Sequence, residues 1–409
     1  MYRKVEESQT LLINHQSKLM EENNQTVYKF GFGQSPFLPP DYVINELKKQ
    51  AHRKEYTSVQ GLLSLREAIS DFHRKANKIE SKADNIFIAP GSKILLYSIL
   101  ACFEKADIIL PQPSWVSYEP QTKLLNHNPI RLKSSFKNRW RVTPEIIREA
   151  FKTKKYKETI MILNYPGNPD GLSYTKEEIK EIASVAKELD IVIIADEIYG
   201  LLTCDNHDSF ANYYPEKTIT TTGLSKWCGA GGWRLGVAIL SEGMATETFK
   251  KTLVGVGSET YSCAPTPIQL AAIKAYEDYH KIEPYILEQR AILKQVGTYC
   301  FQELKESRIQ LYKPEGGFYL FPDFSNFKEK LSQRGIHTSN DLCETLLKEA
   351  QVALLPGSAF GVSEEELVAR LAYVDLEDPL KINESFVLEK HAPRIIEGIQ
   401  RIKKWLLEL

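Results

Sequence analysis

The sequence predicts an α/β protein whose large domain has a mostly parallel central sheet flanked by helices, together with a small α+β domain. Two observations predict this class. From about residue 56 to 240, short apolar runs alternate with helical segments, and the apolar runs show little polar alternation. Such runs are typical of strands that helices cover on both faces of a parallel sheet. After residue 240, long helical segments and a few short strands replace this alternation.

Composition narrows the class of protein. A chain of 409 residues is long enough for two or three domains. Lys plus Arg number 52 and Asp plus Glu 53, so no strongly basic face is expected and nucleic acid is not an expected partner. The six cysteines are scattered without a Cys-x-x-Cys pair, which favours a reducing compartment over a disulfide framework or zinc site.

The composition also predicts a cytoplasmic protein that has no metal site and no membrane-spanning segment. The eight histidines form no metal-like cluster, so no metal site is predicted. No run approaches the roughly 20 apolar residues of a membrane span. The first residues carry no apolar core of the kind that a secretory signal needs.

The elements follow in order along the chain. Residues 1–30 are polar and predict a short helix and an arm, and residues 30–40 form a Gly/Pro loop after which Asp41 is expected to cap a helix to about residue 53. Thr175 and Glu178 have the spacing of a capping box at the start of a helix over 175–189. The other helices expected in this half are 92–103 and 143–152, and the strands are 85–89, 107–110, 159–163, 191–195, 218–222 and 235–240.

The last third predicts mainly helices. These span about 245–253, 266–278, 281–306 and 393–407, with short strands around Tyr312, Phe318 and Leu371. The long helix at 281–306 is expected to join the large domain to the small one.

Three motifs point to the chemistry. Lys226 follows an apparent strand in a Ser/Gly-rich loop, with Arg234 eight residues further on. A lysine that forms a Schiff base beside an arginine that binds phosphate is what a pyridoxal-phosphate (PLP) enzyme needs. The second motif is the apolar run 191–195 followed by Asp196 and Tyr199, and the third is Asn-Tyr-Pro-Gly-Asn-Pro-Asp-Gly at 164–171. In this order and spacing, the three motifs resemble those of the class I/II aminotransferases.

The resemblance implies a fold type I PLP-dependent transferase. Its expected parts are an N-terminal arm with part of the small domain at 1–50, a large PLP-binding domain at 51–295 and a small C-terminal domain at 296–409. The implied reaction moves an amino group between an L-amino acid and a 2-oxo acid by a ping-pong mechanism, in a homodimer with shared active sites. A PLP-dependent C–S/β-lyase, a decarboxylase or an acyl-transferring synthase on the same fold stays open. A transcription regulator is disfavoured because the first 30 residues are too few for a DNA-binding domain.

The resemblance assigns catalytic roles to particular residues. Lys226 is expected to hold PLP covalently and then to move a proton at the substrate α-carbon. Asp196 is expected to face the pyridine nitrogen and keep it protonated. Tyr199 and Asn168 are expected to donate to the phenolic oxygen of the cofactor. The family usually has Asn-Pro-Thr-Gly where this chain has Asp170, which is expected only to alter the turn.

Phosphate binding is expected at the start of the helix at residue 92. The backbone amides of Ser92 and Lys93 are the predicted donors, and Ser225 and Arg234 are expected to complete the cradle. Gly223 stands where family members often carry a hydroxyl, so Thr221 or Thr222 is a candidate replacement. Tyr56 resembles the tyrosine that reaches the phosphate of the neighbouring subunit.

The remaining candidates concern the ring and the substrate. Trp115 is expected to stack on the pyridine ring, Arg370 to bind the α-carboxylate bidentately, and Gly33 to contact that carboxylate through its backbone. Asn168 is also expected to contact the substrate. No second arginine can be assigned to a side-chain carboxylate, so the identity of the amino acid is left open.

Overall fold

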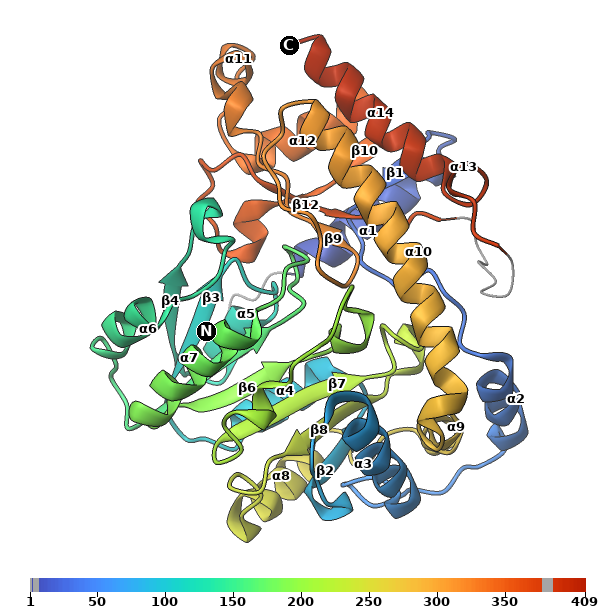
Figure 1. Ribbon diagram of the computed structural model, residues 1–409, viewed down its shortest axis with the longest axis vertical. Helices are drawn as coiled ribbons and strands as arrows, with labels where there is room; N and C mark the ends of the chain where they lie inside the picture. Colours follow the sequence, from blue (N-terminus) through green and yellow to red (C-terminus); the bar gives the residue numbers. More distant parts are fainter. Residues whose placement is uncertain (1, 3–6, 377–384) are drawn as a thin grey trace.

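The computed structural model describes residues 2, 7–376 and 385–409, and a seven-stranded sheet forms its centre (Figure 1). The strand order is β2-β8-β7-β6-β5-β3-β4, and only β8 runs antiparallel to its neighbours. The predicted mostly parallel sheet is therefore confirmed. The strands are β2 (Ile86–Ala89), β3 (Ala106–Gln112), β4 (Asn128–Lys133), β5 (Glu158–Asn164), β6 (Val192–Asp196), β7 (Thr218–Gly223) and β8 (Gly236–Leu240).

Helices cover both faces of this sheet, which explains why the inner residues of β5 and β6 are apolar without polar alternation. Ile160 and Ile162 of β5 pack in one cluster with residues of α4 (Ser92–Ala101) and α8 (Glu247–Thr260). Met161 and Leu163 point to the opposite face and pack with residues of α6 (Pro144–Phe151) and α7 (Lys176–Glu188). Successive residues of a strand face opposite sides, so burying both sides requires a run without polar alternation.

Most of the predicted helices are present with small shifts of their ends, whereas α8 continues to Thr260, beyond the end expected at about residue 253. They are α1 (Gln9–Glu22), α2 (Asp41–Gln50), α9 (Thr266–Tyr276), α10 (Tyr279–Glu306) and α14 (Pro393–Leu407), besides α4, α6, α7 and α8. The capping box of Thr175 and Glu178 is confirmed at the start of α7. The predicted cap at Asp41 is wrong: Pro40 occupies the N-cap position and Asp41 is the first helical residue, where its charge still favours the helix dipole.

Several elements were not predicted. They are α3 (Leu63–Asn77), α5 (Tyr118–Leu124), β4 and α12 (Ser339–Ala350), with the short elements β1 (Tyr28–Lys29), β10 (Val352–Ala353), β11 (Leu355–Pro356), α11 (Lys328–Gln333) and α13 (Leu388–His391). The strand expected around Tyr312 is absent; only an isolated bridge between Gln310 and Asp323 forms there. Near Phe318 and Leu371 the structure has β9 (Tyr319–Leu320) and β12 (Ala369–Ala372).

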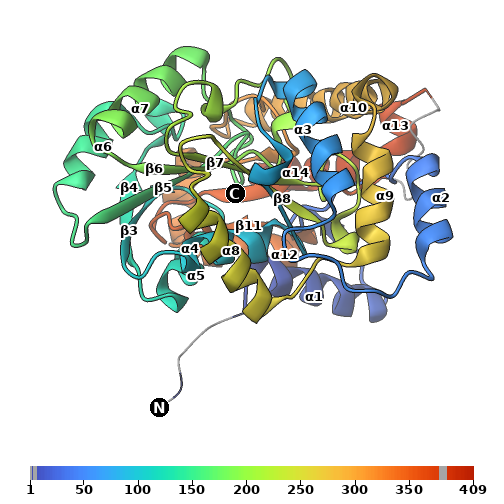
Figure 2. The same cartoon turned by 90° about the horizontal axis from the view of Figure 1, so that it is seen from below.

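The start of the chain lies with its C-terminal part. β1 pairs in parallel with β10, and β11, β12 and β9 form a separate three-stranded sheet. α10 runs from the side of α2 and α9 to the side of α12 and α14, and Figure 2 shows the central sheet between α6 and α7 at one edge and α9 at the other. This pairing agrees with a small unit built from both termini, while the residue boundaries between domains stay a prediction. Among the described helices, none has the length and apolarity to cross a bilayer.

Candidate active site

A cavity of about 440 Å³ lies at the carboxyl ends of the central strands. Asn164 ends β5, Asp196 ends β6, and Ser225 and Lys226 follow β7. Ligands of open α/β sheets collect at this edge. Every predicted site residue except Tyr56 lines the cavity: Gly33, Ser92, Lys93, Trp115, Asn168, Asp196, Tyr199, Ser225, Lys226, Arg234 and Arg370.

Asp196 is a buried carboxylate held by two hydroxyl donors. Its side chain receives a hydrogen bond from the Tyr118 hydroxyl at 2.6 Å and another from the Thr221 hydroxyl at 3.3 Å. Burial raises the pKa of Asp196 to about 6, while both donors act in the opposite direction by stabilising the anion. The Thr221 hydroxyl therefore has a partner inside the protein, and whether Thr221 or Thr222 replaces a phosphate contact at Gly223 stays a prediction.

Lys226 carries an amine that is easily deprotonated. Its Nζ donates to the carbonyl oxygen of Gly33 at 2.7 Å. Loss of hydration, reinforced by the nearby cations Arg370 and Arg234, lowers the pKa of Lys226 to about 7. A large fraction of the side chain is therefore neutral at physiological pH, as an amine nucleophile or base requires.

Arg370 is a buried guanidinium that has no anionic partner in the described part of the chain. It is 1 % exposed, and it donates from Nη1 to the Asn168 amide oxygen at 3.0 Å and from Nη2 to the Gly31 carbonyl at 2.5 Å. Its Nε has no hydrogen-bond partner, and among the described residues no carboxylate pairs with it. Burying an unpaired charge is costly, so this site favours an incoming carboxylate.

Tyr319 fixes the surroundings of this guanidinium. Its ring lies 4.8 Å from the guanidinium carbon of Arg370, and its hydroxyl is 2.9 Å from that of Tyr199. A Cβ at Gly33 would lie 2.0 Å from the same hydroxyl oxygen. Only a glycine at position 33 therefore allows the N-terminal segment to approach Tyr319 and Lys226 this closely.

A second cationic corner lies at the N-terminus of α4. Gly91 precedes the helix with φ of 97°, and Ser92 is its first residue. The guanidinium of Arg234 lies against the backbone here, since a Cβ at Gly91 would be 1.9 Å from Nη2. The positive end of a helix and a guanidinium together form an anion site.

Lys93 and Trp115 form one wall of the cavity, whereas Tyr56 lies elsewhere. The Lys93 Nζ is 5.1 Å from the centre of the Trp115 ring, and burial together with Arg234 lowers the pKa of Lys93. Tyr56 is 88 % exposed in a loop and does not reach the cavity of its own chain. Its expected contact with a second subunit stays a prediction.

Three residues of the site were not assigned roles from the sequence. Tyr118 holds Asp196, and Tyr319 contacts both Tyr199 and Arg370. Asn164 braces the loop, because its Nδ2 donates to the Asp196 carbonyl at 2.8 Å and its Oδ1 accepts from the Asn168 amide at 2.7 Å. Asn164 opens the motif at 164–171, so its position in the sequence was a usable signal.

Known proteins match this chain over nearly its whole length. Residues 25–378 match the family model described as aminotransferase class I and II. An aspartate aminotransferase of Bacillus subtilis (strain 168) is 32 % identical over 94 % of this chain and 97 % of its own length. A probable aspartate/prephenate aminotransferase of Aquifex aeolicus is also 32 % identical, over 98 % and 96 %.

Solved structures of aminotransferases also superpose on nearly the whole chain. An aromatic aminotransferase from Pyrococcus horikoshii superposes with a TM-score of 0.81 at 28 % identity, over 97 % of this chain and 99 % of that one. An aspartate aminotransferase from Thermus thermophilus with maleate gives 0.85 at 21 % identity, over 98 % and 100 %, a likeness that bears on the fold alone. The fold is that of the fold type I PLP enzymes. The chain belongs to the class I and II aminotransferases and is a transaminase.

Proposed function

We propose that this transaminase binds PLP through Lys226 and moves an amino group between an L-amino acid and a 2-oxo acid by a ping-pong mechanism. The observation that carries the proposal is Arg370, a buried cation that has two neutral acceptors and no carboxylate among the described residues. The α-carboxylate shared by amino acids and 2-oxo acids supplies the missing anion, so one site serves both half-reactions.

The residues of the cavity fit PLP. The N-terminus of α4 with Arg234 suits the phosphate, the anionic Asp196 suits a protonated ring nitrogen, and Trp115 offers an aromatic face. PLP, when bound, supplies the electron sink that stabilises negative charge at the substrate α-carbon.

The chain supplies the proton transfers and the orientation. Lys226 would accept the proton from the substrate α-carbon and deliver it to C4′ of the cofactor, because its lowered pKa lets the amine alternate between charged and neutral forms near neutral pH. Arg370 orients the substrate by its carboxylate. Tyr199 and Asn168 line the cavity, and both would donate to the phenolic oxygen of the cofactor.

An absorbance spectrum of the purified protein tests this function. We expect a band from lysine-bound PLP that disappears with particular amino acids and returns with a 2-oxo acid. Lys226→Ala should lose both the band and the transfer. A protein that binds PLP without these half-reactions, and releases pyruvate and ammonia from a cysteine conjugate, would support the lyase alternative instead.

For the amino donor we propose a dicarboxylic amino acid. The relatives from Bacillus subtilis and Aquifex aeolicus both carry aspartate in their names. The cavity also holds Lys93, a cation beyond Lys226, Arg234 and Arg370. Lys93→Gln should raise KM for aspartate about tenfold while KM for alanine changes little, since a charged hydrogen bond contributes about 1.5–3 kcal/mol. Equal effects on both substrates would exclude this role for Lys93.

We further propose a cytoplasmic homodimer in which Tyr56 reaches the phosphate site of the second copy. The exposure of Tyr56 supports this, and the six described cysteines are free, as in a reducing compartment. Tyr56→Phe should weaken PLP binding in a dimer established by sedimentation. The proposed domains are 1–50, 51–295 and 296–409, and limited proteolysis tests their boundaries.

A further inference from the structure

The segment between β4 and α6 has an unusual backbone. Arg139 and Trp140 are consecutive residues with φ of 57° and 56°. The left-handed region costs a non-glycine residue about 1–2 kcal/mol, and such conformations persist where the surrounding contacts determine them. Arg139 and Arg141 form the ion pairs of this segment, with Glu178, Glu315 and Asp170.

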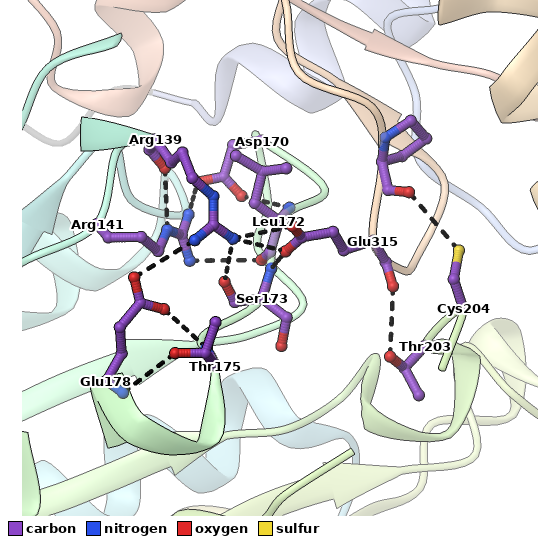
Figure 3. A network of polar contacts seen from close by, with 11 residues as sticks. Arg139, Arg141, Asp170, Leu172, Ser173, Thr175, Glu178, Thr203, Cys204 and Glu315 are labelled. Carbon is purple, nitrogen blue, oxygen red and sulfur yellow. Dashed lines mark hydrogen bonds and ion pairs between the residues drawn. The ribbon is translucent and has the colours of Figure 1, made fainter. Parts of the chain in front are cut away.

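Arg141 forms a buried ion pair with Asp170, in the motif that carries Asn168 (Figure 3). The side chain of Arg141 is 6 % exposed and that of Asp170 is 5 % exposed. Asp170 also accepts from the Leu172 amide at 2.9 Å, and Arg141 donates from Nε to the Arg139 carbonyl at 3.0 Å. The expectation that Asp170 only alters the turn is therefore wrong, because its carboxylate is the partner of a buried guanidinium.

The loop closes tightly around this carboxylate. A Cβ at Gly167 would lie 2.1 Å from Oδ1 of Asp170, and the Gly167 amide donates to the Leu172 carbonyl at 2.8 Å. Asn168 lies between Gly167 and Asp170, so the ion pair and the backbone bond together fix its position.

Asn168 transmits this position to the active site. Its side-chain oxygen Oδ1 accepts from Arg370 and its backbone amide donates to Asn164, while its side-chain Nδ2 has no hydrogen-bond partner among the described residues. A displacement of the loop would remove one of the two acceptors that orient the guanidinium of Arg370.

Arg139 fastens the other end of the loop. Its Nη2 donates to both carboxylate oxygens of Glu315 at 2.9 Å, and Glu315 accepts from the Ser173 amide at 2.8 Å. The Gly171 carbonyl accepts from the amides of Glu315 and Gly316 at 2.8 and 3.1 Å. The same loop is thus joined to the segment that leads into Tyr319.

We propose that Arg141 and Asp170 are positioning residues for substrate binding, which fix the loop so that Asn168 holds Arg370 toward the substrate carboxylate. This inference rests on the proposed function, because the carboxylate role of Arg370 is part of it. Stability alone gives little reason for the pair, since replacing buried ion pairs by apolar groups is often neutral or stabilising.

The test is the double variant Arg141→Met/Asp170→Thr, which removes both charges and places the family's usual residue at 170. In the holoenzyme we expect KM for the amino acid and Kd for maleate to rise roughly ten- to hundredfold, with kcat within about twofold. The melting temperature and the PLP absorbance band should stay near those of the wild type. The matched control is Arg148→Met/Glu188→Thr, an exposed ion pair between α6 and α7 that should leave KM and Kd unchanged.

Unchanged KM and Kd in a folded double variant would overturn the inference while the wild type still transaminates. If the double variant does not fold, Arg141→Lys carries the test, because it keeps the charge and loses the planar fork. We expect a several-fold rise in KM there, and wild-type KM would overturn the inference. A wild type without transamination would overturn the proposed function, and the inference with it.

Discussion

Replacement of Tyr118 by Phe isolates the electrostatics of Asp196. The hydroxyl of Tyr118 donates to the Asp196 carboxylate at 2.6 Å inside the protein, and the substitution removes that donor with little change of shape. A hydrogen bond to a charged group contributes about 1.5–3 kcal/mol. At 1.36 kcal/mol per pKa unit, its loss should raise the pKa of Asp196 by about one to two units, from about 6 toward 7 or 8.

The sign of the resulting pH dependence follows from linkage. Because the pKa of Asp196 is raised from its ordinary value of 3.8 to about 6 in the folded cofactor-free protein, stability is lost as the pH rises through this window. In the Phe variant the loss continues until the pH passes the higher pKa. The variant should therefore be further destabilised, relative to wild type, by about 1.5–3 kcal/mol more at pH 8.5 than at pH 4.5.

Urea unfolding of the cofactor-free protein at the two pH values measures this difference. Tyr276→Phe is the control, because it removes a buried hydroxyl that donates to no carboxylate among the described residues. Its effect should not depend on pH. A Tyr118→Phe effect of the same size at pH 4.5 and pH 8.5 would refute the assignment of Tyr118 as the donor that keeps Asp196 ionised.

Three further changes test the cations and the close packing around them. Arg370→Leu should raise KM for every amino acid donor at least about tenfold, since it removes a charged partner; a wild-type KM would exclude Arg370 as the carboxylate site. Gly33→Ala should displace Tyr319, weaken its bond to Tyr199 and raise KM, because the new methyl would lie 2.0 Å from the Tyr319 hydroxyl. An unchanged KM would contradict the requirement for glycine at position 33. The rate of PLP uptake by cofactor-free protein should increase as pH rises through about 7, where Lys226 loses its proton, and a flat profile in stopped-flow absorbance would contradict that pKa.

Short sequence patterns predicted the elements whose formation depends on neighbouring residues. The strands β5 and β6 were predictable because their inner residues are buried on both faces and hence apolar. The capping box at Thr175 and Glu178 needs only a spacing of three residues. The motifs around Asp196 and Lys226 directly follow strands, so their shared position at one edge of the sheet followed from the topology.

Contacts between residues far apart in the sequence could not be predicted from such short patterns. β1 and β10 are two residues each, and they pair residues Tyr28 and Val352, which are far apart in sequence. The edge strand β4 alternates buried and exposed positions and contains a proline, so it lacks the apolar run that identified its neighbours. The partner of Asp170 lies 29 residues earlier in the chain, and nothing in the turn itself indicates which residue that is.

Burial and the cations of the cavity together lower the pKa of Lys226. Among the described residues that line it, Lys93, Lys226, Arg234 and Arg370 are basic and Asp196 is the one carboxylate. Lost hydration, reinforced by repulsion from Arg370 and Arg234, makes a proton on Lys226 unfavourable and lowers its pKa. A ligand that brings a phosphate and one or two carboxylates would neutralise Arg234, Arg370 and Lys93, and would thereby restore the affinity of Lys226 for a proton. Ligand binding and proton transfer at Lys226 are therefore coupled by the same excess of positive charge.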